Sequence, residues 1–158
     1  MSNMPLSAAK PWFEYPIRVQ PHHTDYGGVV WHGTYITWME SARVECLRAA
    51  GTPFETLVAL GYDLPVVGLD IRYRKPLSLG MEALVKTRLV PSKGVRLNWQ
   101  YEIVSIGASA EGSPELCVTG QVSLVTVKLS DRTIVRRLPP EVKTIVERVT
   151  AQFSARPD

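Results

Sequence analysis

Hydrophobic and polar residues alternate along much of the second half of the chain, which is the pattern of strands that bury one face. The clearest alternation sets Val95, Leu97, Trp99, Tyr101 and Ile103 between Arg96, Asn98, Gln100 and Glu102. Residues 69–74 alternate in the same manner, and residues 83–90 and 116–129 form two further runs rich in Val, Leu and Thr. Turn residues separate these runs without room for crossover helices, so we expect antiparallel neighbours.

A helical periodicity precedes the strands. Its apolar members are Tyr35, Trp38, Met39, Ala42, Cys46, Ala49 and Ala50, with Ile36 and Leu47 widening the stripe. Thr37, Ser41, Glu45 and Arg48 fall on the opposite side. This spacing predicts a long helix that begins near His32 and Gly33 and ends at Gly51, just before Pro53. A short helix over residues 54–60 and a closing helix from Pro139 to about Phe153 are also expected.

One long apolar helix and a curved antiparallel sheet pack most economically when the sheet wraps the helix. We therefore predict an α+β fold, with five or six strands around one long central helix. The length of 158 residues favours a single domain over residues 14–158, preceded by a disordered or extended lead over residues 1–13.

Composition narrows the possible functions. The net charge of +3 is carried by scattered Lys and Arg, which argues against a nucleic-acid partner. Cys46 and Cys117 fall in apolar runs and are expected to be reduced core residues of a cytoplasmic protein. No Cys or His spacing indicates a metal site. No uninterrupted apolar stretch is long enough for a signal peptide or an integral membrane span.

The most informative segment runs from His22 to Gly51, because it places an acid before a glycine pair and a helix start. The first unpaired N–H groups of that helix, at His32 and Gly33, would face the turn that carries Asp25. Acyl transfer requires such a pairing of a carboxylate with donors aimed at the carbonyl oxygen. The plainer interpretation is that Asp25 only shapes a turn or caps the helix.

The segment resembles the signature of the hot-dog-fold acyl-CoA thioesterases, in the 4-hydroxybenzoyl-CoA thioesterase-like group that includes the Tol-Pal-associated short-chain type. The matching residues are Asp25, Gly28, Val29, Val30, Trp31, His32 and Tyr35, then Glu40 and Arg43, followed by Lys75-Pro76-Leu77 and Leu138-Pro139. The likeness extends from about Tyr15 to Val149. Two family acids are absent, since His23 and Met81 stand in their places.

The resemblance implies a hot-dog fold and hydrolysis of a short-chain or aromatic acyl-CoA to a free acid and coenzyme A. Asp25 would attack the thioester or activate water, while the N–H groups at His32 and Gly33 polarise the carbonyl. The His32 side chain would have an orienting or proton-transfer role in catalysis. The plainer alternative is that His32 is only a residue at the helix start. Tyr35 is expected in the pocket wall. Glu40 is the alternative catalytic acid, although we expect it to pair with Arg43.

The coenzyme part of the substrate would be bound by basic residues, for which the candidates are Arg72, Arg74, Lys75, Lys93 and Arg96. No separate cofactor is implied. The family arrangement implies a homodimer with the active site at its interface, and pairs of dimers forming a homotetramer. The alternatives are a thioesterase that releases an acyl or polyketide chain from a carrier protein, a hydratase of the same fold, and an acyl-binding protein.

Overall fold

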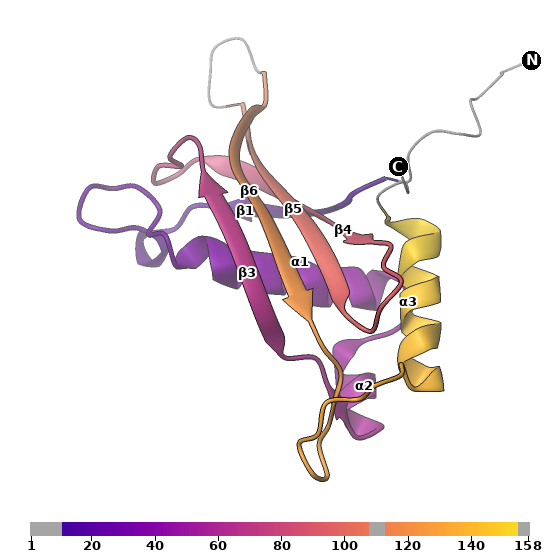
Figure 1. Ribbon diagram of the computed structural model, residues 1–158. Helices are drawn as coiled ribbons and strands as arrows, with labels where there is room; N and C mark the ends of the chain where they lie inside the picture. The colour runs from indigo at the N-terminus through magenta and orange to yellow at the C-terminus, as the bar shows by residue number, and fades with distance from the viewer. Residues whose placement is uncertain (1–10, 108–112, 155–158) are drawn as a thin grey trace, which may run out of the picture.

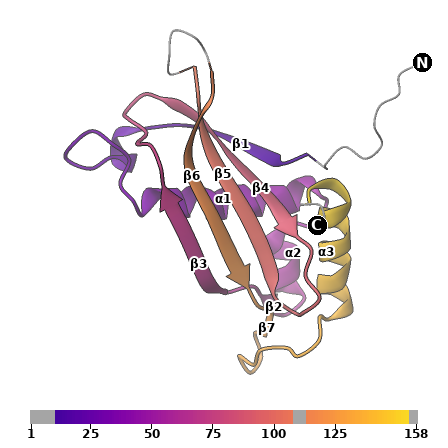
Figure 2. The same ribbon diagram turned by 45° about the horizontal axis from the view of Figure 1, so that its top comes forward.

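The computed structural model describes residues 11–107 and 113–154. A five-stranded antiparallel sheet forms one layer, in the order β1-β4-β5-β6-β3 (Figure 1 and Figure 2). Its strands are β1 (Phe13–Arg18), β3 (Val66–Tyr73), β4 (Glu82–Val90), β5 (Leu97–Ile106) and β6 (Glu115–Leu124). The predicted antiparallel sheet is therefore confirmed.

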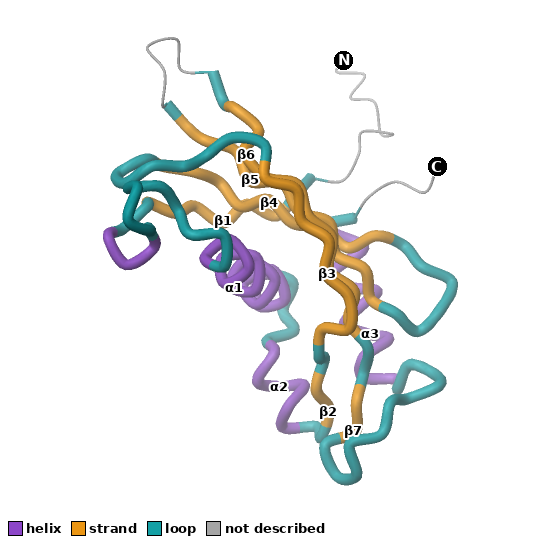
Figure 3. The backbone as a smooth tube through the Cα atoms, turned by 60° about the vertical axis from the view of Figure 1, so that its left-hand side comes forward, coloured by secondary structure: helices purple, strands orange, loops and turns teal. Residues whose placement is uncertain are grey.

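Helix α1 (Thr34–Ala49) lies against one face of the sheet, and Figure 3 shows the strands curving over it. Helix α2 (Phe54–Ala59) follows α1. Helix α3 (Pro140–Gln152) lies beside the end of β4, where the Leu89 N–H donates to the Phe153 carbonyl (Figure 1). A short 3-10 helix over Pro21–His23 precedes the loop that leads into α1. This is the expected α+β hot-dog arrangement, with one long central helix under a curved sheet.

The core lies between α1 and the inward face of the sheet. Along β5, the predicted alternation holds, because Leu97, Trp99, Tyr101 and Ile103 are buried. A glycine lets the helix approach closely: a Cβ on Gly120 of β6 would lie 2.8 Å from Cε of Met39. Met39 itself is fully buried. The Met39 side chain of α1 therefore packs directly on the backbone of β6, where Gly120 leaves room for it.

Four details of the predicted elements are wrong. The alternation over residues 69–74 does not bury one face, because Leu69 and Tyr73 of β3 are exposed. Ile36 and Ala49 are exposed rather than part of the buried stripe of α1. The strand expected over residues 116–129 is split, because β6 ends at Leu124 and β7 (Val127–Lys128) pairs with β2 (Tyr62–Asp63) in a separate two-stranded sheet. The split occurs beside Pro65, whose carbonyl accepts from the Val125 N–H at 3.2 Å. Phe13, assigned to the lead, is already the first residue of β1.

Strand β3 forms one edge of the sheet and carries four large apolar side chains that are 44–50% exposed, namely Val66, Val67, Leu69 and Tyr73. Natural proteins seldom leave such an edge uncovered. The part of the chain that the structure describes contains no helix long and apolar enough to cross a bilayer.

Candidate active site

Asp25 lies in the loop between the 3-10 helix and α1, where its side chain shapes a turn. The Gly27 N–H donates to Oδ1 of Asp25 at 2.7 Å, and the Asp25 N–H donates to the Val29 carbonyl at 2.9 Å. Gly28 has a φ of 75°, a conformation that other residues rarely adopt. Asp25 therefore does shape a turn, as the plainer interpretation predicted. The turn uses only one of its carboxylate oxygens, and the Asp25 side chain is exposed.

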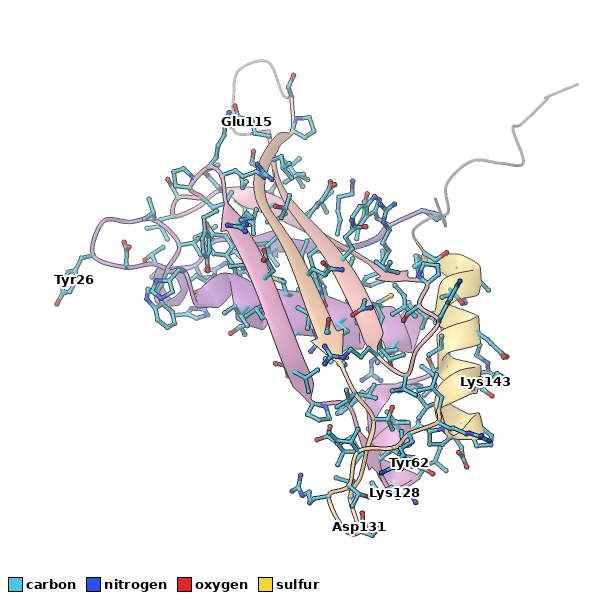
Figure 4. All side chains as sticks on the ribbon, viewed as in Figure 1. Tyr26, Tyr62, Glu115, Lys128, Asp131 and Lys143 are labelled. Atoms are coloured by element: carbon cyan, nitrogen blue, oxygen red, sulfur yellow. The ribbon has the colours of Figure 1, made fainter. Side chains whose placement is uncertain are left out.

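Backbone hydrogen bonds tie this loop to the segment before β4. The Val30 N–H donates to the Leu77 carbonyl at 2.8 Å, and the Leu79 N–H donates to the Gly28 carbonyl at 3.0 Å. Tyr26, at the tip, projects into solvent away from the body of the protein (Figure 4). The loop thus holds Asp25 at a fixed place while its tip makes no contribution to the core.

Helix α1 begins next to this loop, with Gly33 as its N-cap and no side chain capping it. Asp25 is therefore not a helix cap. The N–H groups of His32 and Gly33 donate to no described residue, which leaves them available to an oxygen atom. The Tyr73 hydroxyl of β3 donates to the His32 carbonyl at 2.9 Å and fixes the position of the helix start.

Gly33 also lies directly beneath the ring of Trp31. A Cβ built on Gly33 would lie within 2.8 Å of three carbons of that ring. Only glycine permits this close approach, so the identity of residue 33 determines how the indole lies against the first turn of α1.

A cavity of about 330 Å³ opens between the loop, the helix start and the end of β3. It is lined by Asp25, Val30, His32, Tyr35, Tyr73, Arg74, Lys75 and Pro76. The structure thus brings together five of the predicted site residues, and Gly33 adjoins them as the neighbour of His32. The sequence pattern does not single out Tyr73, which resembles an ordinary strand residue there.

Tyr35 forms the buried wall of this cavity, as expected for a pocket residue. Its hydroxyl accepts from the Leu77 N–H at 3.4 Å, and its ring contacts those of Trp38 and Tyr73, each with a centroid distance of 5.5 Å. Burial raises the pKa of the Tyr35 hydroxyl, which therefore stays protonated at neutral pH.

The candidate phosphate-binding residues fall into two groups. Arg74 and Lys75 line the Asp25 cavity, whereas Arg72 of β3 does not. Arg72 pairs with Asp70 at 3.4 Å, and Lys75 pairs with Glu115 at 3.4 Å. Arg74 forms no ion pair with a described residue. Lys93 and Arg96 lie between β4 and β5, at the opposite end of the sheet. One chain alone does not bring them to Asp25.

The predicted pair between Glu40 and Arg43 is wrong. Arg43 is only 9% exposed, and its Nη1 donates to the Tyr101 hydroxyl at 3.0 Å, whereas Glu40 is exposed and not within ion-pair distance of it. Arg43 occupies the buried face of α1 because it lies four residues after Met39 and three before Cys46. That spacing was present in the sequence. Glu40 lines a different cavity from Asp25.

His23, which stands in place of a family acid, is held by contacts within the protein. Its Nδ1 accepts from the Gln20 N–H at 2.9 Å, and its ring packs edge-on against Trp38 at 5.0 Å. Desolvation, followed by the neighbouring His22, lowers the pKa of His23. The neutral imidazole is therefore favoured.

Comparisons with known proteins agree with this geometry. A family model described as the thioesterase-like superfamily matches residues 19–152. The Synechocystis protein sll0410, provisionally named an esterase, is 52% identical over 137 residues, covering 87% of this chain and 80% of that protein. YbgC of Escherichia coli O157:H7, named an acyl-CoA thioester hydrolase, is 28% identical over 131 residues, covering 83% of this chain and 96% of its own.

A solved structure shows the same likeness. DHNA-CoA thioesterase from Staphylococcus aureus superposes with a TM-score of 0.76 at 27% sequence identity, covering 89% of this chain and 91% of that chain. The matched segment contains the Asp25 loop, all of α1 and the whole of strands β3 to β6. The chain therefore belongs to the thioesterase-like superfamily of hot-dog-fold enzymes.

Proposed function

We propose that the protein hydrolyses an acyl-CoA thioester, with Asp25 as the catalytic carboxylate. The observation that carries the proposal is the shared cavity of Asp25 and His32 at the start of α1, where two backbone N–H groups have no partner among the described residues. Amides at a helix start polarise a carbonyl and stabilise the charge that develops on its oxygen. The names of YbgC and of the S. aureus structure, both thioesterases, support the same reaction.

Asp25 has one oxygen held by the turn and one that no described donor occupies. The free oxygen either attacks the thioester carbonyl, which gives a mixed anhydride and expels the coenzyme A thiolate, or removes a proton from an attacking water. His32, in the same cavity, orients the substrate or supplies a proton to the leaving sulfur. Mass spectrometry after rapid quenching distinguishes the two routes, because only the first gives acylated Asp25.

We propose that residues of two chains together bind the coenzyme. We propose a homodimer in which two β3 edges pair antiparallel, since this edge exposes four large apolar side chains. Such pairing brings the end of the partner sheet that carries Lys93 and Arg96 toward the Asp25 cavity. Arg72, Arg74 and Lys75 of the same chain would supply the remaining phosphate contacts. Dimers would pair again to give a homotetramer.

We also propose that the protein is cytoplasmic and needs no separate cofactor. Cys46 and Cys117 are free and buried, and burial raises the pKa of Cys46 to about 12, as suits inert core thiols in a reducing cytoplasm. Among the described residues, no three His, Cys, Asp or Glu side chains gather as metal ligands. We expect hydrolysis to continue unchanged after treatment with a chelator.

The proposal is tested by a hydrolysis panel of short, medium and aromatic acyl-CoA substrates, run on the wild-type protein and on Asp25→Asn. The asparagine keeps an oxygen that can accept from the Gly27 N–H, so the fold should persist. The rate should fall at least about a hundredfold, the scale for loss of a principal acid–base group. Wild-type activity in Asp25→Asn, or hydrolysis only of acyl-carrier-protein thioesters, would contradict the proposal.

A further inference from the structure

A second cavity carries a buried charge that the proposed chemistry does not use. This cavity of about 310 Å³ lies between α1, α2 and the segment that joins β2 to β3. Its walls are mainly apolar, formed by Val44, Leu47, Phe54, Leu64, Pro65 and Val66. Arg43 also lines this cavity, although the residue is only 9% exposed.

The guanidinium of Arg43 has donors to spare. It carries five N–H donors, and among the described residues it bonds only the Tyr101 hydroxyl. No described carboxylate lies within 4.0 Å of it. Buried charges without an anionic partner are costly, so unused donors in a cavity wall are a place for an acceptor oxygen from another molecule.

Two acids restrict what that acceptor can be. Glu40 and Asp63 line the same cavity, and Oδ1 of Asp63 accepts from the Leu64 N–H at 2.7 Å. Their charges would repel a carboxylate or phosphate. A neutral oxygen, as in a hydroxyl or carbonyl group, can accept from Arg43 without that repulsion, and a hydroxyl can also donate to one of the acids.

The two cavities flank opposite ends of β3. Tyr73, at the last position of the strand, lines the Asp25 cavity, and Val66, at its first position, lines the Arg43 cavity. Within one chain these positions are separated by seven residues, about 23 Å at the rise of a strand. An antiparallel pairing of two β3 edges instead places the first residues of one strand beside the last residues of the other.

We propose that the partner's Arg43 recognises the acyl group bound at Asp25, by donating to a neutral oxygen remote from the thioester. Tyr101 holds the guanidinium in position, and the apolar walls enclose the hydrocarbon part of the acyl group. The substrate class is therefore an acyl-CoA with a hydroxyl or carbonyl oxygen on the distal part of its acyl group. This inference rests on the proposed hydrolysis and on the proposed dimer.

The test compares acyl-CoA substrates that differ only in the distal group, with a methyl, a hydroxyl, a carbonyl or a carboxylate at equal chain length. The readout is the ratio of kcat/KM for each oxygenated substrate to that for the methyl one. Wild type should prefer the hydroxyl or carbonyl compound, and Arg43→Met should lower that preference at least about tenfold, as for loss of a charge-assisted hydrogen bond. Arg48→Met, an exposed position on the same helix, is the matched control and should keep the wild-type ratio.

If Arg43→Met does not fold, Tyr101→Phe provides a second test. This variant keeps the charge of Arg43 but removes the hydroxyl that accepts from its guanidinium, so it should lower the same kcat/KM ratio. A wild-type enzyme that hydrolyses all substrates with equal kcat/KM, or that prefers the carboxylate, overturns the inference and leaves the proposed hydrolysis standing. A wild-type enzyme inactive on every acyl-CoA refutes the proposed function instead.

Mixed dimers test which chain supplies the arginine. When Asp25→Asn and Arg43→Met chains are combined through two affinity tags, one of the two sites regains both Asp25 and the partner's Arg43. The mixed dimer should then show the wild-type ratio, although each parent lacks either activity or preference. If the arginine acted within its own chain, the mixed dimer would keep the lowered ratio of Arg43→Met, which would refute the arrangement.

Discussion

Replacement of Gly33 by alanine tests how the start of α1 is held against the Asp25 loop. The backbone at Gly33 has φ −74° and ψ −24°, which alanine adopts without strain. The added methyl group would, however, overlap three carbons of the Trp31 ring. Any destabilisation by the substitution therefore arises from the contact with Trp31 and not from strain in the folded backbone.

The expected magnitude combines two opposing contributions. Loss of glycine flexibility in the unfolded chain would stabilise the protein by roughly 0.4 to 1 kcal/mol. Overpacking against the indole costs about 1 to 3 kcal/mol, and Trp31 can relieve part of it because the residue is 52% exposed. We expect Gly33→Ala to lower the free energy of unfolding by about 1 kcal/mol. Displacement of Trp31 also shifts the amides of His32 and Gly33, so kcat/KM should fall at least about tenfold.

Urea unfolding and hydrolysis kinetics of Gly33→Ala, Trp31→Ala and the double variant form a double-mutant cycle. Removal of the indole removes the overlap, so the double variant should be more stable than the sum of the single effects by about 1 kcal/mol or more. Additive free energies would show that the indole does not constrain residue 33. The reasoning would then fail, whatever the activity of the single variants.

Three further substitutions test other contacts. Gly120→Ala should destabilise by about 1 to 2 kcal/mol in thermal unfolding, because its Cβ would meet Met39, and Met39→Ala in the same chain should reduce that penalty. Tyr73→Phe removes the hydrogen bond to the His32 carbonyl, so it should lower kcat, while the free energy of unfolding falls by at most about 1.5 kcal/mol. A kcat equal to that of the wild type would contradict the positioning role of Tyr73. The pKa of His23 is lowered in the folded state by desolvation, so unfolding takes up a proton: stability is full above pH 6.5 and decreases as the pH falls from there toward the folded pKa. His23→Asn should flatten this decrease in urea titrations, and an unchanged slope would refute the assignment.

The parts of the fold that follow from local patterns could be predicted from the sequence. Helix α1 was expected from near Gly33 to Gly51 and runs from Thr34 to Ala49, because its periodicity and the terminating glycine are local signals. The alternation in β5 likewise fixes which side chains are buried, since every second residue faces the same side. These signals depend on neighbours a few positions away.

Features that depend on distant contacts were not predictable in this way. β6 ends at Leu124 next to Pro65, which is far away in the sequence but adjacent in space. The helical spacing already places Arg43 on the buried face of α1, but its hydrogen bond to the Tyr101 hydroxyl of β5 depends on how the sheet covers the helix. Lys93 is a candidate phosphate contact from its charge alone, and the sequence does not show that its hairpin lies at the opposite end of the sheet from Asp25.

The tethered loop divides the work of the site between two sets of residues. Asp25 lies in a loop that backbone hydrogen bonds tie to the segment before β4, whereas most of the remaining cavity wall is formed by side chains at and just before the start of α1, and at and just after the end of β3. Exchange of those side chains should thus reshape substrate choice without moving the proposed catalytic acid. A laboratory selection for new acyl preferences should accordingly collect its changes on the helix and the edge strand, and leave residues 25–30 intact.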